Sequence, residues 1–174
     1  ARSYKASSWT RLVQAVELID AIWDDNLETV RALVKQNRHL LYENALIRKD
    51  SNWGPPMTYA ANVGRDRIIQ MLHGLGAEDH RSALARAVLQ TKIGTAKMLH
   101  AMLGNPVPSD GALAGPAYTL SVEGTSFAIG IGARVHDDAC KLLAPVDVVI
   151  ETDGRNPEAK HAILEMYAQR GVVF

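Results

Sequence analysis

Apolar residues recur along this chain at helical spacing, in short stretches that polar residues or glycines interrupt. The first stretch, residues 9–36, carries two apolar stripes on either side of the polar triplet Asp24-Asp25-Asn26. A spacing of three or four positions marks one face of a helix, and the triplet supplies a break and a capping residue. The pattern therefore predicts two helices joined by a tight turn. The first stripe is assigned to Leu12, Val13, Val16, Ile19, Ala21 and Ile22.

The same helix pair is predicted four more times. Residues 55–75 open with Pro55-Pro56, which suits a first helical turn, and Gly64 separates their two apolar stretches. Residues 82–103 follow the same plan, and so do two further stretches at 111–133 and 144–171. Residues 125–131 resemble a strand when taken alone, but the Gly132-Ala133 ending favours a helix. Residues 37–54 and 134–143 are predicted connectors, with Leu40, Leu41 and Tyr42 packing back on the helices.

The predicted second helices end at regular intervals. Their stop residues are Asn37, Gly76, Gly104, Gly132 and Gly171, which lie about 28 or 39 residues apart. The mean separation is close to the period of about 33 residues found in ankyrin repeats. The unequal intervals predict helix pairs of nearly constant length joined by connectors of variable length.

One segment carries a more specific match. Pro55-Pro56-Met57-Thr58-Tyr59-Ala60-Ala61 resembles the T-P-L-H-x-A-A opening of the ankyrin repeat, and Gly76-Ala77 resembles its closing pair. Thr58 replaces the usual histidine, which is expected to weaken local hydrogen bonding. No other unit is expected to keep the helix-start proline. The resemblance is best over residues 55–77 and extends, in degenerate form, over roughly 10–174.

The resemblance implies an all-α solenoid of about five stacked helix-turn-helix units behind a flexible segment, 1–8. The domain would span 9–174, with units at about 9–37, 50–77, 81–105, 111–133 and 144–172. The apolar ending Val172-Val173-Phe174 suggests a piece of a longer protein. We expect the chain to be a monomer. Self-association through the uncapped last unit is the alternative.

Composition narrows the functional classes. The formal net charge is zero, whereas nucleic-acid and anionic-membrane binding normally require a basic excess. No apolar run approaches the roughly 18 residues of a membrane span. The single cysteine, Cys140, excludes an internal disulfide and favours a reducing compartment, so a cytoplasmic location is expected.

Two polar clusters are candidates for chemistry. Cys140 follows His136, Asp137 and Asp138, but no glycine-rich oxyanion turn stands beside them and Leu142-Leu143 indicate simple packing. His73, Glu78, Asp79 and His80 lack the paired histidines or cysteines of a metal motif. His100 and His161 are expected on helix surfaces. We therefore expect no catalytic residue, no metal and no cofactor.

The remaining prediction is a recognition surface. In ankyrin repeats the first helices and connector tips line a concave side that binds other proteins, and the resemblance places five residues there: Asp20, Trp53, Tyr59, Arg86 and Tyr118. Aromatic residues and arginine commonly anchor interfaces. Trp53 packing under its connector and Tyr118 filling between helices remain alternatives. At the level of function, the alternatives are an intramolecular scaffold for a neighbouring catalytic domain, or a thiol- or metal-dependent hydrolase using residues 136–140.

Overall fold

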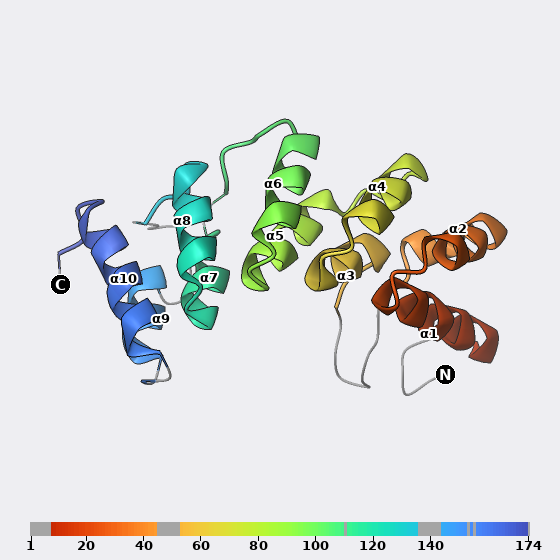
Figure 1. Ribbon diagram of the computed structural model, residues 1–174, viewed down its shortest axis with the longest axis horizontal. Helices are drawn as coiled ribbons and strands as arrows, with labels where there is room; N and C mark the ends of the chain where they lie inside the picture. The colour runs from red at the N-terminus through yellow and green to blue at the C-terminus, as the bar shows by residue number, and fades with distance from the viewer. Residues whose placement is uncertain are drawn as a thin grey trace.

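The computed structural model describes residues 8–44, 53–109, 111–135, 144–152, 154 and 156–173. Every regular element among these residues is helical, as predicted, including the stretch 125–131. The elements, labelled in Figure 1, are α1 (Trp9–Trp23), α2 (Leu27–Gln36), the 3-10 helix η2 (Arg38–Leu41), α3 (Pro56–Val63), α4 (Asp66–Gly74), α5 (His80–Leu89), α6 (Ile93–Met102), α7 (Ala114–Thr119), α8 (Val122–Gly130), α9 (Pro145–Glu151) and α10 (Pro157–Ala168).

The helices form consecutive antiparallel pairs arranged in a row from the N-terminus to the C-terminus (Figure 1). The first helices of the pairs, α1, α3, α5, α7 and α9, contact one another in succession and are called the first-helix layer. The second helices, α2, α4, α6, α8 and α10, are called the second-helix layer. There α2 packs on α4, α6 on α8, and α8 on α10. The chain therefore builds two helical layers along one long axis.

The turn inside each of the first four pairs has the same backbone design. One residue adopts a left-handed conformation, and the next residue donates its N–H to a carbonyl five positions earlier. In the second pair, Gly64 has φ 74° and Arg65 N lies 2.9 Å from Ala60 O. This bond satisfies carbonyl groups that a helix end leaves unpaired. The equivalent left-handed residues are Asp25, Thr91 and Leu120, with φ of 57°, 56° and 50°.

The turn that follows each later second helix uses glycine, as the sequence predicts. Gly76, Gly104, Gly132 and Gly171 all have positive φ, and the following residue again bonds to a carbonyl five positions back. Asn37 differs, because it is extended at φ −141° and caps η2 by accepting a hydrogen bond from His39 N at 3.2 Å. The first pair therefore ends in a capped turn and η2 where the later pairs end at a glycine.

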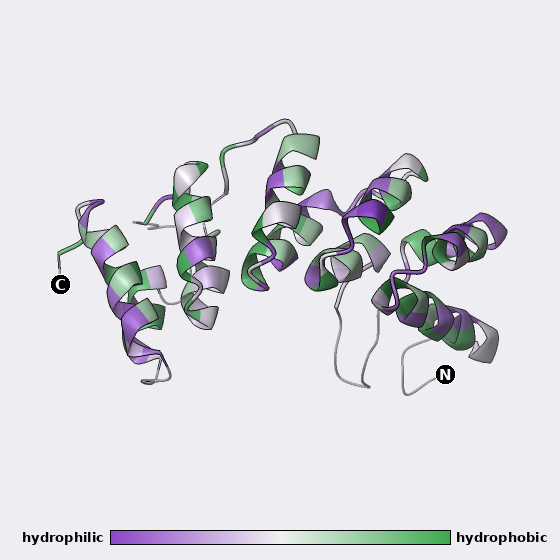
Figure 2. Ribbon diagram, viewed as in Figure 1, coloured by the Kyte–Doolittle hydropathy of each residue, from purple (hydrophilic) through white to green (hydrophobic). Residues whose placement is uncertain are grey.

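The hydrophobic core runs between the two layers and divides into two clusters. The first extends from Leu18 to Leu99 and the second from Leu113 to Tyr167, so the division falls between α6 and α7. Hydrophobic and hydrophilic residues both occur along the helices (Figure 2), because each helix buries one side only. Leu40 and Leu41 join the core as predicted, whereas Tyr42 is exposed.

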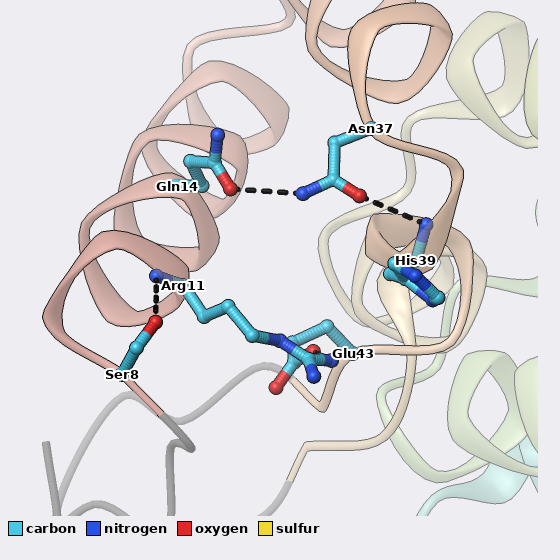
Figure 3. A network of polar contacts seen from close by, with 6 residues as sticks. All are labelled: Ser8, Arg11, Gln14, Asn37, His39 and Glu43. Atoms are coloured by element: carbon cyan, nitrogen blue, oxygen red, sulfur yellow. Dashed lines mark hydrogen bonds and ion pairs between the residues drawn. The ribbon is translucent and has the colours of Figure 1, made fainter.

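Polar contacts tie α1 to the segment after α2 (Figure 3). Ser8 accepts a hydrogen bond from Arg11 N at 3.1 Å and thereby caps α1. Farther along, Asn37 Nδ2 donates to Gln14 Oε1 at 2.9 Å, and Arg11 forms an ion pair with Glu43. These contacts fix the first stretch of the connector against the first pair.

Two local predictions are wrong. Thr58 does not weaken local hydrogen bonding, because its N–H and hydroxyl both donate to Asp79 Oδ2, at 2.9 and 2.6 Å. A single carboxylate thus joins α3 to the turn before α5. The helix-start proline also recurs, since Pro145 is the first residue of α9. Residues 1–7, expected to form most of the flexible segment, lie outside the described residues.

Candidate binding face

Large exposed apolar side chains are distributed unevenly between the layers. Six of them lie on helices of the first-helix layer, and within the described residues none lies on the second-helix layer. The six are Trp9, Val13, Val16, Trp23, Tyr118 and Ile150. Isolated exposed apolar residues are ordinary on a protein surface, but their confinement to one layer is informative. We call the outer side of the first-helix layer the first-helix face.

Most of these residues form a stripe along α1 that sequence reasoning missed. Trp9, Val13, Val16 and Trp23 recur at helical spacing on one side of the helix, and the two tryptophans are 69% and 59% exposed. Val13 and Val16 had been assigned to the buried stripe, which is wrong, and Leu18 is buried in their place. The signal was present in the sequence as a second apolar stripe on the same helix.

Asp20 lies on this face, and Tyr59 lies beside it but is buried. Asp20 is exposed, whereas Tyr59 is 3% exposed, so its prediction as a surface contact is wrong. Both α1 and α5 pack against the short helix α3 and cover most of its residues. Burial raises the pKa of the Tyr59 hydroxyl, the negative charge of Asp20 raises it further, and Arg65 lowers it. Tyr59 is therefore part of the core beneath this face and does not contact a partner directly.

Trp53 and Arg86 are brought together by the fold. The Arg86 guanidinium carbon lies 5.3 Å from the centroid of the Trp53 ring, within the range of a cation–π interaction. Both side chains are half-buried, and Trp53 also packs against the first core cluster. Most of the connector before Trp53 lies outside the described residues, so the alternative that Trp53 packs beneath it stays a prediction. Because both side chains are only partly buried, the pair still offers an aromatic ring and a cation to a partner.

Tyr118 stands apart from the other predicted residues. It lies on α7 and is 70% exposed, so it does not fill space between helices. The structure thus joins the predicted residues in two pairs, Asp20 with Tyr59 and Trp53 with Arg86, and places Tyr118 farther along the row.

The candidate chemical sites gain no support from the described residues. Among them no group of three or more histidine, cysteine or acidic side chains is placed to hold a metal ion. His73 and His80 approach each other, with His80 Nε2 2.8 Å from His73 Nδ1. The cluster at residues 136–140 lies outside the described residues. Within the described chain, no helix has the length and apolar character needed to cross a membrane.

The two histidines expected on helix surfaces differ. His161 is exposed and lies 3.2 Å from Glu165 on the same helix, as expected. His100 is only 8% exposed, so its prediction is wrong. Its Nε2 lies 2.9 Å from the carbonyl oxygen of Pro106 and therefore donates the hydrogen bond. This bond holds the loop after α6 against the helix.

Comparison with known proteins adds no further constraint on the function. No family model matches the chain, and no curated protein matches it.

Proposed function

We propose that this chain is an ankyrin-like solenoid that acts as a non-enzymatic protein-interaction module. The observation that carries the proposal is the confinement of large exposed apolar side chains on helices to the first-helix layer. In ankyrin repeats this layer lines the concave binding side. Burying one such side chain in an interface contributes about 1.5–3 kcal/mol, so the exposed tryptophans and tyrosine are suited to anchor a partner.

The recurring turns support the ankyrin-like part of the proposal. Four helix pairs share one inter-helix turn, and four share one closing glycine turn. Contacts run mainly between successive pairs, as in proteins whose stability is a sum of neighbour terms. The Thr58–Asp79 bonds join the second pair to the third at the segment that carries the family resemblance.

The proposed contact set differs from the one expected from the sequence. Asp20, Trp53, Arg86 and Tyr118 remain in it, and Trp23 joins them because it lies one helical turn from Asp20 and is exposed. Tyr59 is removed because it is buried. A cytoplasmic location, which rests on the single cysteine, and a monomeric state remain part of the proposal.

The test is affinity capture from native lysate with matched surface variants. Trp23→Ala/Tyr118→Ala removes two aromatic residues of the first-helix face, and Lys97→Ala/His161→Ala alters two residues of the second-helix layer. We expect a protein retained by the parent and by the second-layer variant to be lost from the first variant. Circular dichroism and thermal unfolding confirm that both variants are folded. Equal capture by the parent and both variants would refute the proposed face.

A further inference from the structure

A cleft of about 390 Å³ opens between the α5/α6 pair and the α7/α8 pair. It lies where the hydrophobic core divides into two clusters. Small residues line this space on the facing helices: Ala85 on α5, Gly115 on α7 and Ala112 just before α7. The volume falls in the range of about 300–1,000 Å³ that is typical of small-molecule sites.

The walls of the cleft are mainly apolar. Leu84 and Val88 line it from α5, and Ile131 lines it from the end of α8. Leu103, Pro106, Val107 and Pro108 close one side through the loop after α6. The His100 hydrogen bond to Pro106 O holds this loop in place at 2.9 Å. The wall is therefore supported by a buried side chain.

The polar end of the cleft is positively charged. Arg81 lies in the first turn of α5, is exposed, and pairs with no carboxylate among the described residues. The N-terminus of α5 adds a partial positive charge at the same place. Among the residues that the structure describes, none of the side chains that line the cleft is acidic. An arginine beside an apolar cavity is complementary to a molecule with a hydrocarbon body and an anionic end.

We propose that this cleft binds a small amphiphilic carboxylate of the medium-chain fatty-acid class. The carboxylate pairs with the Arg81 guanidinium, and the hydrocarbon chain lies against Leu84, Val88 and Ile131. Binding fills the space between the two core clusters, so the apolar part contributes through the hydrophobic effect. This site is separate from the first-helix face and does not rest on the proposed protein-binding function.

Calorimetric titration of the full chain tests the site, with decanoate below its micelle-forming concentration and decanol as the uncharged control. We expect saturable binding of one decanoate per chain. Arg81→Gln is expected to weaken decanoate binding about three- to tenfold, because a solvent-exposed ion pair is modest in strength, and to leave decanol binding unchanged. Arg67→Gln, on the exposed side of α4, is the matched control and is expected to behave like the parent.

Filling the cleft gives an independent test. Ala85 is exposed at the cleft wall, so Ala85→Phe is expected to occupy the space without disturbing the fold and to abolish decanoate binding. Methyl chemical shifts of Leu84, Leu103 and Val107 in the parent chain locate the ligand without any substitution. Absence of saturable binding, unchanged binding in folded Ala85→Phe, or shifts confined to other parts of the chain would each overturn the proposal.

Discussion

Tyr167 offers a quantitative test of the second core cluster. Its side chain is 0% exposed within that cluster, and burial raises the pKa of its hydroxyl from 10.0 to about 12. The neighbouring Thr125 hydroxyl lowers the pKa in part, although neither oxygen makes a hydrogen bond of acceptable geometry within the described residues. The folded state therefore holds Tyr167 in its neutral form.

The consequence for stability has a definite sign. Below pH 10 Tyr167 is neutral in both the folded and the unfolded chain, and its contribution to stability is fully present. Between pH 10 and 12 the unfolded chain ionises while the folded chain stays protonated, so the free energy of unfolding falls as the pH rises. A pKa difference of about two corresponds to a loss of about 3 kcal/mol that is complete above pH 12.

The assay is urea unfolding at a series of pH values from 8 to above 12, comparing the parent with Tyr167→Phe. Tyr167→Phe is expected to lack the alkaline loss of about 3 kcal/mol in the free energy of unfolding. Near pH 8 it is expected to be as stable as the parent or about 1 kcal/mol more stable, because a buried unpaired hydroxyl is removed. Other alkaline effects, including the raised pKa of Tyr59, cancel in the comparison. Tyr118→Phe, at an exposed site, is the control. Equal alkaline losses in the parent and in Tyr167→Phe would refute the reasoning.

Three further outcomes follow from the fold, each measured as the free energy of unfolding in urea. Thr58→Val keeps the side-chain shape but removes the hydroxyl bonded to Asp79, and is expected to cost about 1.5–3 kcal/mol; a loss below about 0.5 kcal/mol would contradict this. Asp25→Gly removes the strain of a left-handed non-glycine residue and is expected to stabilise the fold by about 0.5–1 kcal/mol, whereas Gly64→Ala introduces that strain and is expected to destabilise it by about 1–2 kcal/mol. A destabilising Asp25→Gly together with a stabilising Gly64→Ala would refute the shared turn. Ile68→Ala is expected to cost about 2–5 kcal/mol because its side chain is fully buried, and a loss under about 1 kcal/mol would show that the site collapses freely.

The helices were predictable because their signals are local. Apolar spacing located each pair, and Gly76, Gly104, Gly132 and Gly171 marked the ends of the later second helices. The inter-helix turns were harder to recognise. Only Gly64 marks its turn with a glycine. Asp25, Thr91 and Leu120 adopt the same left-handed conformation, which aspartate tolerates but the β-branched Thr91 and the bulky Leu120 disfavour. The backbone conformation therefore repeats more regularly from one helix pair to the next than the amino-acid sequence does.

The candidate face was predictable only in part, because exposure depends on the neighbours of each helix. Tyr59 occupies a position expected to be exposed, yet α1 and α5 both cover the short helix α3. Helix α1 packs on α2 and α3 with its other side, so Val13 and Val16 lie in solvent although their spacing is that of a core stripe. The adjacency of Trp53 and Arg86 was not predictable, because the sequence before α3 has no periodic pattern that would place Trp53.

The division of the core between α6 and α7 has a consequence for how the molecule comes apart. The buried residues of each cluster lie on separate sets of helices, and Phe127 of α8 packs across the boundary against the first cluster. We expect this boundary to be the weakest coupling along the row. When the chain is pulled from its two ends, the junction is expected to open first and release two folded blocks that then unravel separately. A force–extension curve with two peaks instead of one would show that the molecule separates at this junction.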